Sequence, residues 1–331
     1  MKAIIQKDTS DPTSLVWADT DDPTPGPGEV LVRIHAAGVN RGDLLQAAGH
    51  YPPPPGASDI IGLEAAGTIV SFGPPAVTTG GVPDVGWSVG DECGVLLAGG
   101  GYAEFVAVPI TQVFPVPRGL SLVDTAGVIE AATTVWSNLG MVAQVKRGHP
   151  VLIHGGSGGI GTFAIQLAHA MGATVATTAG SAENLELCRS LGADILINYR
   201  ADDFVEVMKD RGGADVIVDV MGAKYLDRNV QALGEKGHLV IIGMQGGVTG
   251  ELNIGRLLAR RGSITATAVR SRTLNDKAAV VADTIRNVWP LLESGEVSPQ
   301  VRHTLPIADA VTAHRLLKAR EVTGKIVLTV N

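Results

Sequence analysis

The sequence predicts an α/β protein in which a doubly wound, six-stranded parallel sheet is joined to a smaller, partly open β-barrel. Three observations support this fold class. The chain has 331 residues, enough for about two domains. After about residue 120 its hydrophobic pattern changes from short strands to alternating strands and helices. A glycine-rich turn at 155–161 follows the first buried strand of the alternating part.

Composition excludes several classes of protein. Glycine contributes 42 residues but shows no G-X-Y period, so the chain is not collagen-like. Its only cysteines, Cys93 and Cys188, are too few and too far apart for a disulfide framework or a multi-cysteine zinc lobe. This favours a reducing, cytoplasmic location. The net charge of −7 argues against a nucleic-acid partner. Segment 148–182 has no charged residue, but its proline and glycines interrupt any membrane span.

Short strands separated by turns predict the barrel within the first 124 residues. In segment 29–35, Val30, Val32 and Ile34 alternate with residues of the other face, as in a half-buried strand. Segment 73–90 is rich in Gly, Pro and Thr, which predicts a surface loop. The expected strands of this part are 2–6, 29–35, 65–70, 92–97 and 102–108.

The middle of the chain alternates strands and helices. Ser121 and Asp124 predict the start of a helix over 121–136, and a second helix is expected over 135–145. Near-continuous apolar strands joined by crossover helices, such as 159–171, are typical of a doubly wound parallel sheet. Its six expected strands are 151–154, 174–178, 194–198, 215–220, 239–243 and 263–269.

The last part of the chain, with its short strands, resembles the first part more than the middle, so we expect it to return to the barrel. We therefore assign residues 1–124 and 297–331 to the barrel domain and residues 125–296 to the domain with the parallel sheet. The elements expected near the end are a helix at 276–293, a strand at 301–307, a short helix at 308–319 and a strand at 325–330.

The segment VLIHGGSGGIG at 151–161 has the order strand, glycine turn, helix. Gly155, Gly158 and Gly161 give a GxxGxxG spacing, which permits a tight turn, close approach to a pyrophosphate and close packing of helix on strand. The start of the helix offers unpaired N–H groups to the anion. We therefore predict a dinucleotide site here, which also includes Ser157, Gly159 and Ile160.

The end of the second central strand indicates which dinucleotide is bound. NAD sites usually place Asp or Glu there, but VATTAGS at 175–181 contains no acid. Gly180 and Ser181 can offer backbone and hydroxyl donors to a 2′-phosphate, and Tyr199 with the adjacent Arg200 lies after the third strand. The alternative for Ser181 is the N-cap of a helix over 182–191, and both roles can coexist. Although Glu183 is unfavourable near a phosphate, the pattern favours NADPH.

Six motifs follow one another along the chain: PGPGEVLV (25–32), AGVNRGD (37–43), GLE (62–64), GD (90–91), HGGSGGIG (154–161) and GKIVL (324–328). In this order they resemble the zinc-free quinone oxidoreductases of zeta-crystallin type, in the medium-chain dehydrogenase/reductase superfamily. The segments YPPPPGAS (51–58) and VRSR (269–272) are most similar to the tumour-suppressor-inducible branch. The resemblance implies a Rossmann domain and a GroES-like catalytic domain.

The resemblance also implies catalysis without zinc. Zinc-dependent relatives have Cys where this chain has Asn40 and His where it has Leu63, so no metal site is expected. By resemblance, Asn40, Asp43 and Tyr51 lie near the nicotinamide. Tyr51 would donate its phenol proton to a quinone oxygen, and the Asn40 amide would stabilise the developing oxyanion. From the residues alone, 40–43 is explained as the cap of a helix over 43–48, and Tyr51 as an ordinary aromatic residue of a loop.

Further cofactor contacts are expected. By resemblance, Thr134 would approach the nicotinamide and Lys325 would face the cofactor phosphates. Gly243 and Met244 end the fifth strand, where nucleotide-binding folds open their cleft. The last strand, 263–269, would pair with a second copy of the chain in a homodimer. Two features depart from close relatives: Asn184 stands where those that bind NADPH often have lysine, and segment 73–90 is longer.

We therefore predict an NADPH-dependent quinone oxidoreductase. Two alternatives stay open. One is a reductase of activated alkenes, such as 2-alkenals or enoyl thioesters, which uses the same hydride chemistry. The other is a non-catalytic NADPH-binding protein of crystallin-like or RNA-binding type, against which the acidic composition counts.

Overall fold

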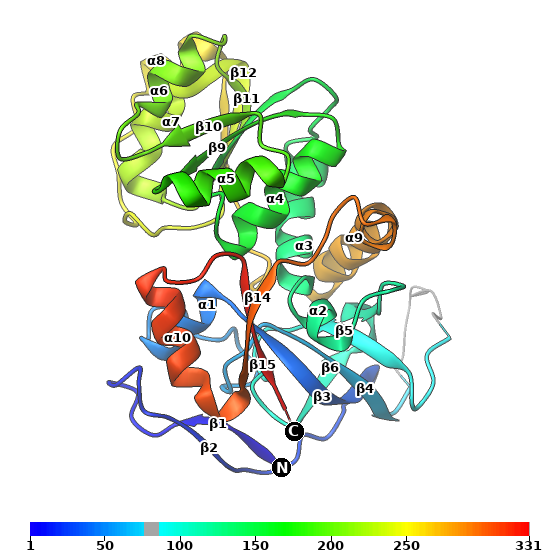
Figure 1. The fold of residues 1–331 in the computed structure, drawn as a ribbon. Helices are drawn as coiled ribbons and strands as arrows, with labels where there is room; N and C mark the ends of the chain where they lie inside the picture. The colour runs from blue at the N-terminus through cyan, green and yellow to red at the C-terminus, as the bar shows by residue number, and fades with distance from the viewer. Residues whose placement is uncertain (76–85, 331) are drawn as a thin grey trace. The chain divides into compact units, whose positions relative to one another are not determined.

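The structure is a computed structural model that describes residues 1–75 and 86–330 (Figure 1). It contains two compact units. Unit 1 comprises Met1–Thr133, Val269–Glu293 and Pro299–Asn331, and unit 2 comprises Thr134–Ala268 and Ser294–Ser298.

Segment 269–293, which the sequence assigned to the domain with the parallel sheet, groups with unit 1. It contains most of helix α9 (Leu274–Ser294). Among its contacts with unit 1, the Trp289 ring stacks on Phe114 with centroids 4.9 Å apart, and its indole N–H donates to the Pro115 carbonyl at 2.7 Å.

Unit 1 is built around β3 (Glu29–Val39), which pairs antiparallel with β4 (Glu64–Phe72), β6 (Phe105–Pro109) and β15 (Lys325–Thr329). Because β15 pairs with β3, the chain does return to this part, as predicted. The sheet runs β14-β15-β3-β4-β5-β7, and this open order fits the predicted, partly open barrel. The remaining strands are β1 (Lys2–Gln6), β2 (Leu15–Asp19), β5 (Glu92–Leu96), β7 (Val113–Pro115) and β14 (Val301–Pro306).

Helices of unit 1 differ from the prediction at one place. Ser121 does cap a helix, since its hydroxyl accepts the Asp124 N–H at 3.1 Å. The expected helix over 121–136 is interrupted at Gly127, which caps the end of the first helix; a Cβ there would lie 2.6 Å from a Val301 methyl group, so glycine leaves the room that this position needs. The helices are α1 (Arg41–Ala47), α2 (Leu122–Ala126), α3 (Ile129–Trp136) and α10 (Ala310–Ala319), with 3-10 turns at Ile110–Gln112 and Ile307–Asp309.

Unit 2 contains the predicted six-stranded parallel sheet, in the order β10-β9-β8-β11-β12-β13. Helices pack on both of its faces, as right-handed crossovers require (Figure 1). The strand order reverses between β8 and β11, which is where such sheets open a crevice at their carboxyl ends. The strands are β8 (Pro150–His154), β9 (Thr174–Ala179), β10 (Ile195–Asn198), β11 (Ala214–Asp219), β12 (Leu233–Ile241) and β13 (Ser263–Ala266).

The expected helix over 135–145 is a π-helical segment, Ser137–Val142, near the start of unit 2. The other helices of this unit are α4 (Gly159–Ala170), α5 (Ala182–Ser190), α6 (Phe204–Lys209), α7 (Leu226–Ala232) and α8 (Ile254–Arg260), with a 3-10 turn at Gly222–Tyr225.

The structure also bears on three further expectations, which concern the cysteines, a membrane span and the loop 73–90. Cys93 and Cys188 are both buried and neither forms a disulfide, as their spacing predicted. Within residues 1–75 and 86–330, no helix is both long and apolar enough to cross a membrane. Most of the predicted loop 73–90 falls on 76–85, outside the described residues.

Candidate functional site

The predicted catalytic residues lie in unit 1, around a buried polar network centred on Glu64, the first residue of β4. The Glu64 carboxylate accepts hydrogen bonds from Asn40 Nδ2 at 2.8 Å, from the Glu130 N–H at 2.7 Å and from Lys325 Nζ at 2.5 Å. Lys325 Nζ also donates to Asn40 Oδ1 at 2.7 Å. Buried charges persist only when paired and hydrogen-bonded, and here both conditions are met.

Lys325 therefore has a different environment from the one the sequence suggested. It was expected to face the cofactor phosphates, but only 5% of the residue is exposed and its ammonium group is enclosed by Glu64 and Asn40. Gly38 makes room for this arrangement, because a Cβ there would lie 2.1 Å from Glu64 Oε1.

Asp43 is fully buried on α1, next to Asn40. Its Oδ2 accepts the Asn40 backbone N–H at 2.7 Å and the Tyr102 hydroxyl at 3.1 Å. Burial raises the pKa of Asp43 to about 7. These two hydrogen bonds and the charge of Lys325 lower the pKa, but their effect is smaller than that of burial. The first of these bonds caps the helix, so the capping role is present, although the helix begins at Arg41 and not at Asp43.

Tyr102 connects Asp43 to helix α10. His314 Nε2 lies 3.4 Å from the Tyr102 hydroxyl oxygen. Burial lowers the pKa of His314 to about 4, so this imidazole is neutral at pH 7. Neither Tyr102 nor His314 was singled out from the sequence, because no local motif indicates a contact between residues 212 positions apart.

Tyr51 is positioned by Arg270. The guanidinium group donates to the Tyr51 carbonyl and to the Ala98 carbonyl, both at 2.8 Å, and its carbon lies 4.7 Å from the centroid of the Tyr51 ring. The ring is close to the start of α1, since a Cβ on Gly42 would lie 3.3 Å from Tyr51 Cε1. Burial raises the pKa of Tyr51, which keeps the phenol protonated. Arg270 was quoted only as part of the VRSR motif, and its role was missed.

The glycine turn in unit 2 lies close to the sheet, at positions where a side chain would not fit. A Cβ on Gly156 would lie 2.1 Å from Thr177 Oγ1, and one on Gly161 would lie 2.2 Å from the Gly155 carbonyl oxygen. Gly155 has φ 72°, a conformation that favours glycine. The turn therefore packs tightly onto the sheet, and its outer side leads into α4 at Gly158.

Helix α4 presents its amino-terminal end beside this turn. The first N–H groups of a helix have no partner within it, and the helix dipole favours an anion there. The residues at this end are partly buried and so can be reached by a ligand: Ser157, Gly158, Gly159 and Ile160. A pyrophosphate fits this donor set.

Gly180 and Tyr199 lie together after β9 and β10. A Cβ on Gly180 would be 2.3 Å from the Tyr199 hydroxyl oxygen, so glycine lets the phenol lie against the chain. Tyr199 is 38% exposed and can reach a ligand. Ser181 caps α5, as its alternative interpretation predicted, because its hydroxyl accepts the Asn184 N–H at 3.2 Å. Its contact with a phosphate stays a prediction.

The loops after β11 and β12 pack closely on each other. A Cβ on Gly243 would lie 2.9 Å from a carbonyl oxygen of the β11 loop, and the adjacent Met244 is 57% exposed. The buried Asp219 carboxylate fixes the β11 loop by accepting the N–H groups of Met221 at 2.7 Å and Gly222 at 2.9 Å. Burial raises the pKa of Asp219 to about 6. Asp219 was missed, although it ends a buried strand three residues before a glycine.

Thr134 lies in α3, at the residue where unit 2 begins. Its carbonyl oxygen accepts Asn138 Nδ2 at 2.7 Å. Its contact with a nicotinamide stays a prediction.

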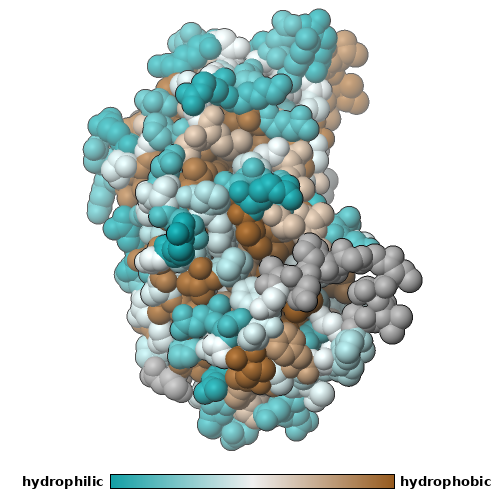
Figure 2. Space-filling view, turned by 90° about the vertical axis from the view of Figure 1, so that its right-hand side faces the viewer, coloured by the Kyte–Doolittle hydropathy of each residue, from teal (hydrophilic) through white to brown (hydrophobic). Residues whose placement is uncertain are grey.

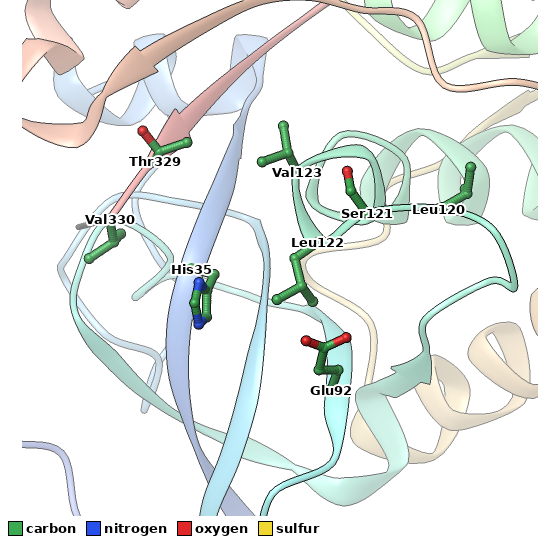
Figure 3. A pocket seen from close by; sticks show the side chains of 8 residues that line it. All are labelled: His35, Glu92, Leu120, Ser121, Leu122, Val123, Thr329 and Val330. Atoms are coloured by element: carbon green, nitrogen blue, oxygen red, sulfur yellow. The ribbon is translucent and has the colours of Figure 1, made fainter.

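A separate pocket of about 430 Å³ occurs in unit 1 (Figure 3). In the figure, His35 on β3 and Glu92 on β5 face it from the sheet, and the start of α2 forms another wall. Asn40 is five residues beyond His35 along an extended chain, about 16 Å away. None of the predicted site residues lines this pocket. Its lining residues are His35, Glu92, Leu120, Ser121, Leu122, Val123, Thr329 and Val330.

In the described ranges, no group of three or more His, Cys, Asp or Glu side chains is arranged to hold a metal ion. Leu63, where zinc-dependent relatives have histidine, is a buried apolar residue. Catalysis without zinc stays a prediction.

Comparison with known proteins now assigns a family. Residues 26–118 match the alcohol dehydrogenase GroES-like domain, and residues 159–291 match the zinc-binding dehydrogenase family. The chain is 31% identical to the 2-haloacrylate reductase of Burkholderia sp, over 99% of this chain and 98% of that protein. The chain belongs to the medium-chain dehydrogenase/reductase superfamily. It is an oxidoreductase of this superfamily, and the zinc-free, zeta-crystallin type fits.

Solved structures give the same result. The mycobacterial protein Rv1454c, complexed with NADPH, has a TM-score of 0.88 and 29% identity, with both chains covered completely. Escherichia coli quinone oxidoreductase, also complexed with NADPH, has a TM-score of 0.88 and 25% identity over the whole of both chains. Some relatives are much longer: the chain covers 14% of the mycobacterial phthioceranic/hydroxyphthioceranic acid synthase, to which it is 34% identical.

The Glu64–Lys325 pair yields a stability prediction. Lys325→Met leaves a buried carboxylate without its cation, and we expect the free energy of unfolding to fall by about 3–5 kcal/mol. Adding Glu64→Gln removes the unpaired charge, so the double variant should recover a large part of this loss. Urea unfolding followed by tryptophan fluorescence measures both effects. A single variant as stable as the native protein would contradict the buried ion pair.

Proposed function

We propose that this protein is an NADPH-dependent reductase that transfers a hydride to a quinone without zinc. The observation that supports it best is the buried network of Asn40, Asp43, Glu64 and Lys325 with Tyr51 close to the start of the same helix. This network offers hydrogen-bond donors and a protonatable carboxyl group, which together can stabilise a reduced oxygen in place of a metal ion.

NADPH supplies the hydride from C4 of its nicotinamide when it is bound. The residues of unit 2 fit its binding: the turn at 155–161 would hold the pyrophosphate, and Gly180, Ser181 and Tyr199 would contact the 2′-phosphate. Thr134, Gly243 and Met244 would contact the nicotinamide end. Two similar proteins that contain NADPH support this cofactor.

Lys325 acts in this proposal by orienting Asn40. The amide oxygen accepts from Lys325 and the amide nitrogen donates to Glu64, which fixes the amide in one orientation. The second hydrogen of Asn40 Nδ2 is then left for the oxygen of a substrate. Tyr51, held by Arg270 and kept protonated by burial, donates a further hydrogen bond.

An acceptor assay tests the quinone proposal. The native protein should oxidise NADPH with a small panel of quinones, and Tyr51→Phe should lower kcat by about 10²-fold, as removal of an acid–base group typically does, without changing the Kd of NADPH. Tyr225→Phe is the matched control, because that ring packs on His154 and Phe204 in the core of unit 2. No rate above the enzyme-free reaction, with cofactor bound, would exclude the proposal.

Reduction of activated alkenes is the second candidate. It is favoured by the 2-haloacrylate reductase, a similar protein whose name describes that class of acceptor. The same assay distinguishes the two, since a 2-alkenal with a higher kcat/KM than every quinone would assign the protein to alkene reduction. Tight NADPH binding with no turnover on any acceptor would favour the non-catalytic alternative.

The preference for NADPH over NADH depends on Tyr199. Tyr199 is 38% exposed and its hydroxyl lies beside Gly180, and a hydrogen bond to a phosphate contributes about 1.5–3 kcal/mol. Tyr199→Phe should therefore weaken NADPH binding by roughly tenfold or more and leave the Kd of NADH unchanged. Titration of both cofactors by fluorescence measures this, with NADH as the internal control. If the native protein bound NADPH and NADH with equal affinity, the proposed contact between Tyr199 and the 2′-phosphate would be contradicted.

We also propose that two copies of the chain form a homodimer through β13. This strand ends the six-stranded sheet, and an edge strand must be covered to avoid unwanted pairing. Unit 2 also has exposed apolar residues. The exposed fraction is 80% for Val248, 69% for Ile254 and 74% for Leu258. Figure 2 shows hydrophobic side chains at the upper right margin of the molecule, in the part that belongs to unit 2.

The mass in solution tests the dimer. Light scattering at micromolar concentration should give twice the mass of one chain. Val248→Glu together with Leu258→Glu should shift the protein to the mass of one chain, because the charges would be buried in the interface. Val16→Glu, on an exposed apolar residue of unit 1 (38%, against 80% for Val248 and 74% for Leu258), is the control. A native protein with the mass of one chain would contradict the dimer.

A further inference from the structure

We propose that His154 is a positioning residue for the cofactor: through the Thr178 hydroxyl it holds the glycine turn in the conformation that leaves N–H groups for a pyrophosphate. This role rests on the proposed function, because the turn at 155–161 is proposed to bind the pyrophosphate of NADPH. It goes beyond that function, because it assigns the side chains that hold the turn in place.

The N–H groups of the turn fall into two sets. Those of Gly155 and Gly156 are bound to Thr178 on β9, which accepts the first with its hydroxyl oxygen at 3.2 Å and the second with its carbonyl oxygen at 3.0 Å. Others make no hydrogen bond to any described residue: those of Ser157, Gly159 and Ile160. The second set is therefore available to a ligand, and Thr178 holds the first.

Gly155 is the residue on which this division depends. The peptide groups on both of its sides are bound to Thr178, so its φ of 72° is fixed from outside the turn. Its carbonyl oxygen accepts the Gly158 N–H at 3.1 Å, and Gly158 is the N-cap of α4. If the hydrogen bond from Gly155 to the Thr178 hydroxyl is lost, the first peptide group can rotate and the free N–H groups of the turn lose their fixed direction.

His154 determines which way the Thr178 hydroxyl points. Its Nδ1 lies 3.2 Å from Thr178 Oγ1, and its Nε2 lies 2.8 Å from Asn229 Oδ1. Since an amide oxygen only accepts, the ring proton is on Nε2 and Nδ1 accepts the hydrogen of the Thr178 hydroxyl. The hydroxyl hydrogen is therefore turned away from Gly155, and the oxygen presents a lone pair to the Gly155 N–H.

The surroundings of His154 keep its imidazole in this one state. The residue is 1% exposed, and the Phe204 ring meets it edge-on with centroids 4.8 Å apart. Burial lowers the pKa of His154 to about 4, so the imidazole is neutral at pH 7 and Nδ1 keeps its lone pair. Because both nitrogens are bound to protein groups, His154 acts on the turn only through Thr178.

Substitution of Thr178 tests the first link. Thr178→Val keeps the shape of the side chain but removes the hydroxyl, and we expect the Kd of NADPH to rise by about tenfold, which corresponds to the loss of roughly one hydrogen bond. Adenosine 2′-monophosphate, which lacks the pyrophosphate, should keep its Kd in the same isothermal titration. Thr178→Ser, which retains the hydroxyl, should bind NADPH like the native protein. Thr284→Val is the matched control, since it removes a buried hydroxyl of unit 1 that donates to the Val280 carbonyl at 2.7 Å.

Two amide substitutions test His154. The side-chain oxygen of asparagine can take the place of Nδ1, and the side-chain amide of glutamine can take the place of Nε2. His154→Asn should therefore keep the Kd of NADPH close to the native value, whereas His154→Gln, which retains only the bond to Asn229, should raise it as Thr178→Val does. A histidine that only fills the core would give the same Kd in both variants, and that result would overturn the proposed role.

A double-mutant cycle tests whether the two residues act as one. His154→Gln added to Thr178→Val should not raise the Kd of NADPH further, because both substitutions act through the same hydroxyl. Effects that multiply in the double variant would contradict a connection between His154 and the turn through Thr178.

Failure of this role and failure of the proposed function give different results, because binding is measured without an acceptor. A Kd of NADPH that Thr178→Val leaves unchanged would overturn the role of His154 alone. A loss of affinity for adenosine 2′-monophosphate as large as that for NADPH would also overturn it, since unit 2 would then be disturbed as a whole. A native protein that binds NADPH but reduces no acceptor would overturn the proposed function alone, and one that binds no NADPH would overturn both.

Discussion

The structure of unit 1 depends on the charge pair between Glu64 and Lys325. The Glu64 carboxylate joins four segments that are distant in the sequence: β4, the end of β3 through Asn40, the start of α3 through Glu130, and β15 through Lys325. The partners of a buried carboxylate must stay within hydrogen-bond distance, because the loss of any donor leaves part of its charge unpaired in an apolar environment. The orientation of the Asn40 amide follows from this constraint, because its oxygen accepts from Lys325 and its nitrogen donates to Glu64.

Elements with a strong local pattern could be predicted from the sequence. The six parallel strands are nearly continuous apolar runs, and the turn at 155–161 combines a strand, closely spaced glycines and a helix within eleven residues. Both signals are contained in short segments. The break at Gly127 and the π-helical segment Ser137–Val142 were missed, because apolar periodicity does not distinguish a short interruption or i→i+5 hydrogen bonding from a continuous α-helix.

The candidate site was only half predictable for the same reason. Asn40, Asp43 and Tyr51 were found through their motifs, but the residues that orient them were not. Tyr102 is 59 positions from Asp43, and Arg270 is 219 positions from Tyr51, so neither contact leaves a local trace in the sequence. Lys325 was predicted through its motif, but its environment was not. A lysine in a strand does not indicate that its ammonium group will pair with a carboxylate from another strand.

The position of β15 has a consequence for folding. Lys325 and Asn40 are separated by 285 residues, and bringing them together closes a very long loop. Most of unit 2 is one uninterrupted stretch, Thr134–Ala268, inserted within unit 1. If this stretch folds first, it brings its two flanks closer together and lowers the entropic cost of pairing β15 with β3. The sheet of unit 1, with its buried charges, is then the last part of the protein to form, and slow folding of unit 2 would delay its assembly.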